Sequence, residues 1–157
     1  MRTAKSKSTT TGARSGGLKR ILVPFDFSTG AEHALEHSVN YARRFKAGLT
    51  LVHIVHLPYL GIGFGPGEGL GMEDRLVGDA TEQLAAIAAR LERKGVAAGT
   101  VVRVGHPVRD VVDVARREGA DMIVMGTHGR SGLKHALLGS VAEGVLRHAP
   151  CAVLVVR

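Results

Sequence analysis

The chain has 157 residues, of which 45% are apolar and 4% aromatic, and a net charge of +7. This length suits a single globular domain, and no apolar run is long enough to cross a membrane. A single cysteine, Cys151, excludes an internal disulfide and is typical of a reducing, cytoplasmic compartment.

The positive charge is concentrated at the start of the chain. Residues 1–20 carry six cations and no acid, whereas the remainder carries fifteen cations and fourteen acids. Because the first residues are rich in Ser, Thr and Gly, residues 1–18 are predicted to form a disordered basic tail, solvated or in weak contact with an anion or a membrane surface. Residues 19–157 form the predicted single domain. With few aromatics and no Trp, nucleic acid is an unlikely partner.

Short apolar runs alternate with helical patterns along the rest of the chain. Strands are predicted at 20–24, 49–55, 100–104, 122–125 and 152–156, the last two covered on both faces. Helices are predicted from 28 or 29 to 45, from about 73 to 94, from 107, and from 140 to the residue before Pro150. This alternation indicates an α/β fold with a five-stranded parallel sheet and helices on both faces, as in Rossmann-like proteins.

Local signals predict the helix starts and buried faces. The first helix is predicted to begin with Ser28 or Thr29 as its N-cap, and Thr29–Glu32 and Ser140–Glu143 both have the spacing of a capping box. The helical periodicity places Phe45 on the buried face of the first helix and Leu76 on that of the second.

A glycine motif follows the fourth predicted strand. It reads Gly126-Thr127-His128-Gly129, then nine residues, then Gly139-Ser140 at a helix start. Glycine lets the backbone approach an anion, and a helix N-terminus offers unpaired N–H groups to phosphate. No Lys stands between Gly139 and Ser140, so the motif is not a P-loop.

Further candidate residues lie at the ends of the predicted strands. Ligands of parallel sheets bind beyond the carboxyl ends of the strands, where the strand order reverses. The strand ends of interest are Pro24-Phe25-Asp26, Ile54-Val55-His56 and Met125-Gly126-Thr127.

Gly126-x2-Gly129-x9-Gly139-Ser140 resembles the ATP-binding motif of the universal stress protein family. The resemblance extends to residues 23–28, 52–55 and 150–156 and covers about residues 18–157. It implies a fold like that of the adenine nucleotide alpha hydrolases.

The resemblance also implies roles for individual residues. Asp26 would contact the ribose, and Gly126 and Gly129 would bring the loop backbone to the ribose and phosphates. The adenine pocket would comprise Pro24, Phe25 and the backbone of Ile54. The phosphate donors would be Gly139, Ser140 and Val141, and the implied site is completed by Met125, Thr127 and Ala142. Arg130, in the nine-residue loop, either neutralises phosphate charge or is solvated. Ala142 stands where many members carry a hydroxyl group, so one phosphate contact is lost.

Several positions have a second interpretation from the residues alone. Asp26 either binds ligand or caps the first helix, and Gly139 is either a backbone donor or a turn residue. His128 either contacts phosphate or orders its loop. The pair His33 and His37 has metal-ligand spacing but lacks a third ligand, which favours a solvated helix face. Residues 61–71, with six glycines, form either a mobile loop or a lid.

The resemblance implies a cytoplasmic, homodimeric protein that binds ATP, or AMP, with Mg²⁺. The dimer would form through the C-terminal strand. The protein would act as a nucleotide-dependent regulator of the stress response, with slow or no hydrolysis, no assigned catalytic residue and no metal site of its own. One alternative is a non-catalytic dimeric interaction module with an empty or AMP-filled pocket, and another is an ATP-consuming enzyme of the related hydrolase type.

Overall fold

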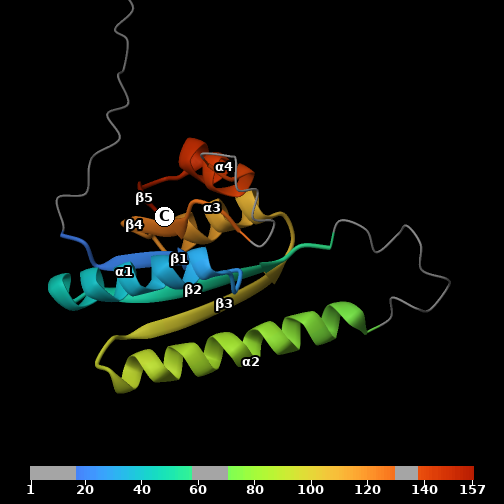
Figure 1. Ribbon diagram of the computed structural model, residues 1–157, viewed down its shortest axis with the longest axis horizontal. Helices are drawn as coiled ribbons and strands as arrows, with labels where there is room; N and C mark the ends of the chain where they lie inside the picture. Colours follow the sequence, from blue (N-terminus) through green and yellow to red (C-terminus); the bar gives the residue numbers. More distant parts are fainter. Residues whose placement is uncertain (1–16, 58–70, 130–137) are drawn as a thin grey trace, which may run out of the picture.

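The computed structural model describes residues 17–57, 71–129 and 138–157, which form a parallel five-stranded sheet flanked by helices (Figure 1). The elements are β1 (Arg20–Pro24), α1 (Thr29–Phe45), β2 (Gly48–Val55), α2 (Met72–Arg93), β3 (Ala98–Val104), α3 (Pro107–Arg117), β4 (Met122–Gly126), α4 (Ser140–His148) and β5 (Ala152–Val156). The strand order is β3-β2-β1-β4-β5, which confirms the predicted fold. Strands β2, β3 and β4 extend one or two residues beyond their predicted bounds.

Two apolar layers hold the helices to the sheet. On one face, alternate β1 residues such as Ile21 and Val23 pack with α1 and with Leu84 of α2. On the other face, Leu22 packs with residues of α3 and α4, including Val145. The period-two alternation of a strand therefore divides the core into two clusters, one beneath each helix pair.

Both predicted capping boxes are wrong. The N-cap of α1 is Ser28, whose Oγ accepts from the Ala31 N–H at 3.2 Å, so the third helical position holds no Glu. Helix α4 has Gly139 as its N-cap, and Ser140 is already its first helical residue, without a side-chain capping bond. Backbone conformation, which the residue spacing does not report, decides which residue stands at the helix boundary.

Two residues predicted on the buried faces of α1 and α2 are exposed. The Phe45 side chain is 49% exposed and stacks on Tyr41, with ring centroids 6.4 Å apart. Leu76 is 40% exposed. Both lie near an end of their helix, where the sheet no longer covers the helix.

Strand β5 lies at the edge of the sheet, beside β4. Its residues are mostly half-buried, with Ala152 exposed and Val156 buried, so its predicted burial on both faces is wrong. The burial of β4 is as expected, because this strand lies between β1 and β5.

The predicted tail falls almost entirely outside the described residues, as do most of the glycine-rich segment and Arg130. Leu18, at the end of the predicted tail, packs against the cluster beneath α1 and α2. None of the described helices combines the length and apolar composition that a membrane span needs.

Helix α2 offers a matched test of the core. Leu84 is fully buried whereas Leu76 on the same helix is 40% exposed. We expect Leu84→Ala to lower the free energy of unfolding by about 2–5 kcal/mol through lost burial and a residual cavity, and Leu76→Ala to change it by less than about 1 kcal/mol. Urea unfolding followed by circular dichroism measures both values, and equal losses would contradict this packing of α2.

Candidate functional site

A cavity of about 380 Å³ opens at the carboxyl edge of the sheet. It lies at the ends of the neighbouring strands β1 and β4, whose following helices leave toward opposite faces of the sheet. This is the switch point at which a ligand is expected in this topology. All the described candidate residues line it: Pro24, Phe25, Asp26, Ile54, Met125, Gly126, Thr127, Gly129, Gly139, Ser140, Val141 and Ala142. Arg130 lies outside the described residues, so its expected role remains a prediction.

The loop after β4 packs backbone to backbone on the start of α1. A Cβ at Gly126 would lie 2.8 Å from the carbonyl carbon of Gly30, and a Cβ at Gly30 would lie 2.9 Å from the His128 carbonyl oxygen. Real Cβ atoms are not found so close to backbone atoms, so both positions require glycine. The sequence motif included Gly126 but not Gly30, because the contact joins residues far apart in the chain.

The end of the motif is closed by one hydrogen bond. The N–H of Gly139 donates to the carbonyl oxygen of Thr127 at 2.7 Å, so Gly139 closes the loop and its N–H is not directed at a ligand. The first helical bond of α4 runs from the Glu143 N–H to the Gly139 carbonyl. The N–H groups of Ser140, Val141 and Ala142 therefore have no carbonyl acceptor within α4, as at every α-helix start. All three residues line the cavity.

Asp26 is held rigidly at the end of β1. Its Oδ1 accepts from the Ser28 N–H at 3.1 Å and from the Ser28 hydroxyl at 2.5 Å. Ser28 is the residue that caps α1, so Asp26 supports the cap without being the cap itself. A Cβ at Gly129 would lie 2.6 Å from Oδ2 of Asp26, which places this carboxylate directly beside the glycine loop.

An aromatic corner fixes the backbone on both sides of Asp26. Phe27 adopts a left-handed conformation with φ of 63°, which is unfavourable for a bulky residue. Its ring packs edge-on against Phe25, at 5.4 Å between centroids, and lies 4.9 Å from the His53 ring. His53 Nδ1 also hydrogen-bonds the Phe25 carbonyl at 2.7 Å. These contacts stabilise the strained turn and thereby fix the direction of Asp26.

The backbone of Ile54 extends past the end of β1. The backbone N–H and C=O groups of the even-numbered residues of β2 point toward β1. The Gly48 N–H donates to the Lys19 carbonyl, and the Val52 carbonyl accepts from the Phe25 N–H, each at 2.8 Å. Backbone groups two residues apart in a strand point the same way. The N–H and C=O of Ile54 therefore project to the side of β2 that β1 covers only as far as Phe25.

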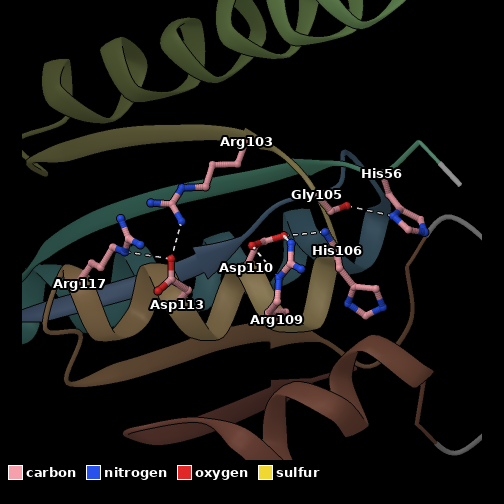
Figure 2. A network of polar contacts seen from close by, with 8 residues as sticks. All are labelled: His56, Arg103, Gly105, His106, Arg109, Asp110, Asp113 and Arg117. Carbon is pink, nitrogen blue, oxygen red and sulfur yellow. Dashed lines mark hydrogen bonds and ion pairs between the residues drawn. The ribbon is translucent and has the colours of Figure 1, made fainter. Parts of the chain in front are cut away.

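Figure 2 shows a polar network at the rim of the cavity. His56, which lines the cavity, hydrogen-bonds through Nδ1 to the Gly105 carbonyl at 3.0 Å. Its ring meets that of His106 at nearly a right angle, with centroids 5.7 Å apart. The sequence pattern placed His56 only at the end of a strand and did not predict its contact with His106, because this contact depends on the pairing of β2 with β3.

Charged residues anchor the start of α3 in the same network. Asp110 accepts from the His106 N–H and from Arg109 Nη2, the latter at 3.0 Å. The hydrogen bond from Arg109 is the main reason that the pKa of Asp110 is lowered, with the His106 N–H contributing in the same direction. The carboxylate therefore remains ionised and holds the turn that carries His106.

The remaining candidates lie on α1, in the glycine loop and just before β5. His33 and His37 are both exposed on α1, and the part of the chain that the structure describes holds no group of three residues able to bind a metal ion. His128 lines the cavity, and its Nδ1 hydrogen-bonds the Thr127 hydroxyl at 3.0 Å, an arrangement compatible with either of its two expected roles. Burial raises the pKa of the Cys151 thiol, which is unfavourable for a reactive thiolate.

The sheet order defines a Rossmann-like α/β protein, and the cavity lies at the switch point of its sheet. The profile of the universal stress protein family matches residues 17–157. The chain belongs to the universal stress protein family.

Individual relatives agree with this assignment. Universal stress protein MJ0531 of Methanocaldococcus jannaschii is 37% identical over 142 residues, covering 88% of this chain and 82% of the relative. The solved structure of MJ0577, from the same organism, is 34% identical with a TM-score of 0.79, covering 88% of this chain and 94% of that one. A universal stress protein from Archaeoglobus fulgidus, solved in complex with dAMP, is 24% identical with a TM-score of 0.61, covering 89% and 98%.

The contact between Gly126 and Gly30 can be tested by adding one methyl group. Gly126→Ala places a Cβ 2.8 Å from backbone atoms, and we expect it to lower the free energy of unfolding by about 1–3 kcal/mol. Gly99→Ala in β3 is the control, since its Cβ meets nothing within 4 Å, and we expect it to be neutral or slightly stabilising. Denaturant unfolding compares them, and a stable Gly126→Ala variant would show that the two segments do not touch.

The lowered pKa of Asp110 predicts a dependence of stability on pH. Because the carboxylate is favoured in the folded state, its contribution is fully present above the ordinary aspartate value of 3.8 and is lost as the pH falls through the lowered pKa. Asp110→Asn and Arg109→Gln should therefore lose less stability than the parent protein between about pH 5 and pH 2. Urea midpoints across this range provide the measurement, and identical slopes for all three proteins would refute the coupling.

Proposed function

We propose that the cavity binds an adenine nucleotide. The observation that carries the proposal is that the three N–H groups at the start of α4 and an apolar slot belong to one cavity. A helix start favours an anion, and the slot between Ile54 and Val111 suits a planar base. Membership of the family supports this assignment, as does the dAMP complex of the Archaeoglobus protein.

The lining suits a polyphosphate whose charge is partly offset from outside the protein. Neither Lys nor Arg is among the described lining residues, so groups such as backbone N–H and the Ser140 hydroxyl take the place of cationic side chains there. Mg²⁺, when bound through phosphate oxygens, would supply the missing positive charge, and Arg130 would add to it. The preferred ligand is therefore ATP with Mg²⁺, and AMP is the alternative because it requires less neutralisation.

The protein acts, in this proposal, as a cytoplasmic regulator of the stress response and turns ATP over slowly or not at all. A P-loop enzyme places a lysine on the outer phosphates, and in this chain no lysine stands between Gly139 and Ser140. The bound nucleotide would then serve mainly as a signal.

Strand β5 favours a second role as an interaction module. It is an apolar edge strand, half-buried through Val153, Leu154 and Val155, and such edges pair readily with another strand. We propose that two copies associate through β5 as a homodimer. An assembly with an empty or AMP-filled cavity would be the non-catalytic alternative to the ATP-dependent regulator.

Binding of ATP to Gly129→Val tests the proposal. The Cβ of this variant alone would lie 2.6 Å from Asp26 Oδ2, so the valine side chain would displace the carboxylate and fill the loop side of the cavity. We expect at least a tenfold weaker affinity by isothermal titration calorimetry with Mg²⁺, equivalent to about 1.4 kcal/mol.

Gly99→Val is the matched control, because it adds the same side chain to an open position of β3 and should bind ATP like the parent protein. Native mass spectrometry of the purified parent protein would show which adenine nucleotide is bound. Equally weak binding of ATP by the parent and by Gly129→Val would favour the interaction module.

A further inference from the structure

We propose that His56 selects the base of the bound nucleotide, favouring 6-aminopurines such as adenine over 6-oxopurines such as hypoxanthine. The inference rests on the proposed nucleotide site and concerns a side chain at its rim. No part of the glycine motif is involved, since the recognition occurs at the opposite end of the cavity.

The cavity has two chemically different ends. Its α4 end carries the N–H groups of Ser140, Val141 and Ala142, which suit phosphate. Its β2 and α3 end is formed by apolar groups, including Ile54 and Val111. A nucleotide with its phosphates at α4 would therefore direct its base toward β2 and α3. His56 lines the cavity at the end of β2.

One hydrogen bond determines which nitrogen of His56 can accept. Nδ1 lies 3.0 Å from the carbonyl oxygen of Gly105. A carbonyl oxygen only accepts, so Nδ1 must carry the hydrogen atom and donate it. In the neutral ring, Nε2 is then the nitrogen with the free lone pair and acts as a hydrogen-bond acceptor.

The ring of His56 is also held in place, as Figure 2 shows. Gly105 donates its own N–H to the Val55 carbonyl at 3.0 Å, so the acceptor of the His56 bond is part of the β2–β3 pairing. The His106 ring packs edge-on against His56 at 5.7 Å, and its backbone N–H is anchored by Asp110. A side chain held before the ligand arrives loses little conformational freedom on binding.

A fixed acceptor distinguishes the two classes of purine by the group on C6. The 6-amino group of adenine donates hydrogen bonds, whereas the 6-oxo group of hypoxanthine accepts them. Nε2 of His56 would therefore bind the first and repel the second, leaving two acceptors facing each other without a proton. The backbone of Ile54 is unchanged by substitutions at His56, so variants at this position isolate the contribution of the imidazole.

The experiment compares the affinities of ATP and ITP, which differ in the C6 substituent and in the proton on N1. Isothermal titration calorimetry with Mg²⁺ at pH 8, where imidazoles are neutral, gives the ratio of the two dissociation constants. His56→Asn retains an amide donor near the position of Nδ1 but has no counterpart of Nε2, and His56→Phe retains a ring without nitrogen. His37→Asn is the control, because His37 is an exposed histidine on α1 that does not line the cavity.

We expect the preference of the parent protein for ATP over ITP to fall by about three- to tenfold in His56→Asn and His56→Phe and to persist in His37→Asn. An unchanged ratio in both His56 variants, with ATP still bound, would overturn this inference and leave the nucleotide site intact. Absence of any nucleotide binding by the parent protein would overturn the proposed function and this inference with it.

Discussion

The site depends on the direct contact of two backbone segments, the start of α1 and the loop that follows β4. Gly30 and Gly126 approach each other more closely than side chains permit. Because β1 and β4 are neighbours whose helices leave toward opposite faces of the sheet, this contact brings Asp26 at the end of β1 beside Gly129. The cavity is a consequence of this contact.

Around this contact, each polar group of the site is oriented by a second group. Asp26 is held by Ser28, His56 by the Gly105 carbonyl, and the glycine loop by the bond from Gly139 to Thr127. Phe27 keeps a left-handed backbone because aromatic packing stabilises it. Such preorganisation lowers the conformational entropy that these groups would lose when a ligand binds.

The sequence predicted the sheet, the positions of its strands and many of the residues that line the cavity, because hydrophobic periodicity and the glycine motif are local signals. It missed the contact of Gly30 with Gly126 and that of His56 with His106, since both depend on segments that meet only in the folded chain. The capping boxes failed because Ser28 and Gly139, not Thr29 and Ser140, adopt the extended conformation of an N-cap. Phe45 and Leu76 were placed in the core because periodicity does not show where the sheet ends.

The glycines differ in what they reveal about ligand binding. Side chains at Gly30, Gly126 and Gly139 would collide with main-chain atoms, so replacement of any of the three would lower the stability of the fold even in a descendant that no longer binds a ligand. A side chain at Gly129 would meet only the tip of the Asp26 side chain, so substitution of this glycine would lower the stability of such a descendant little. Among homologous chains, loss of the glycine equivalent to Gly129 should therefore precede loss of the other three when a cavity no longer binds its ligand.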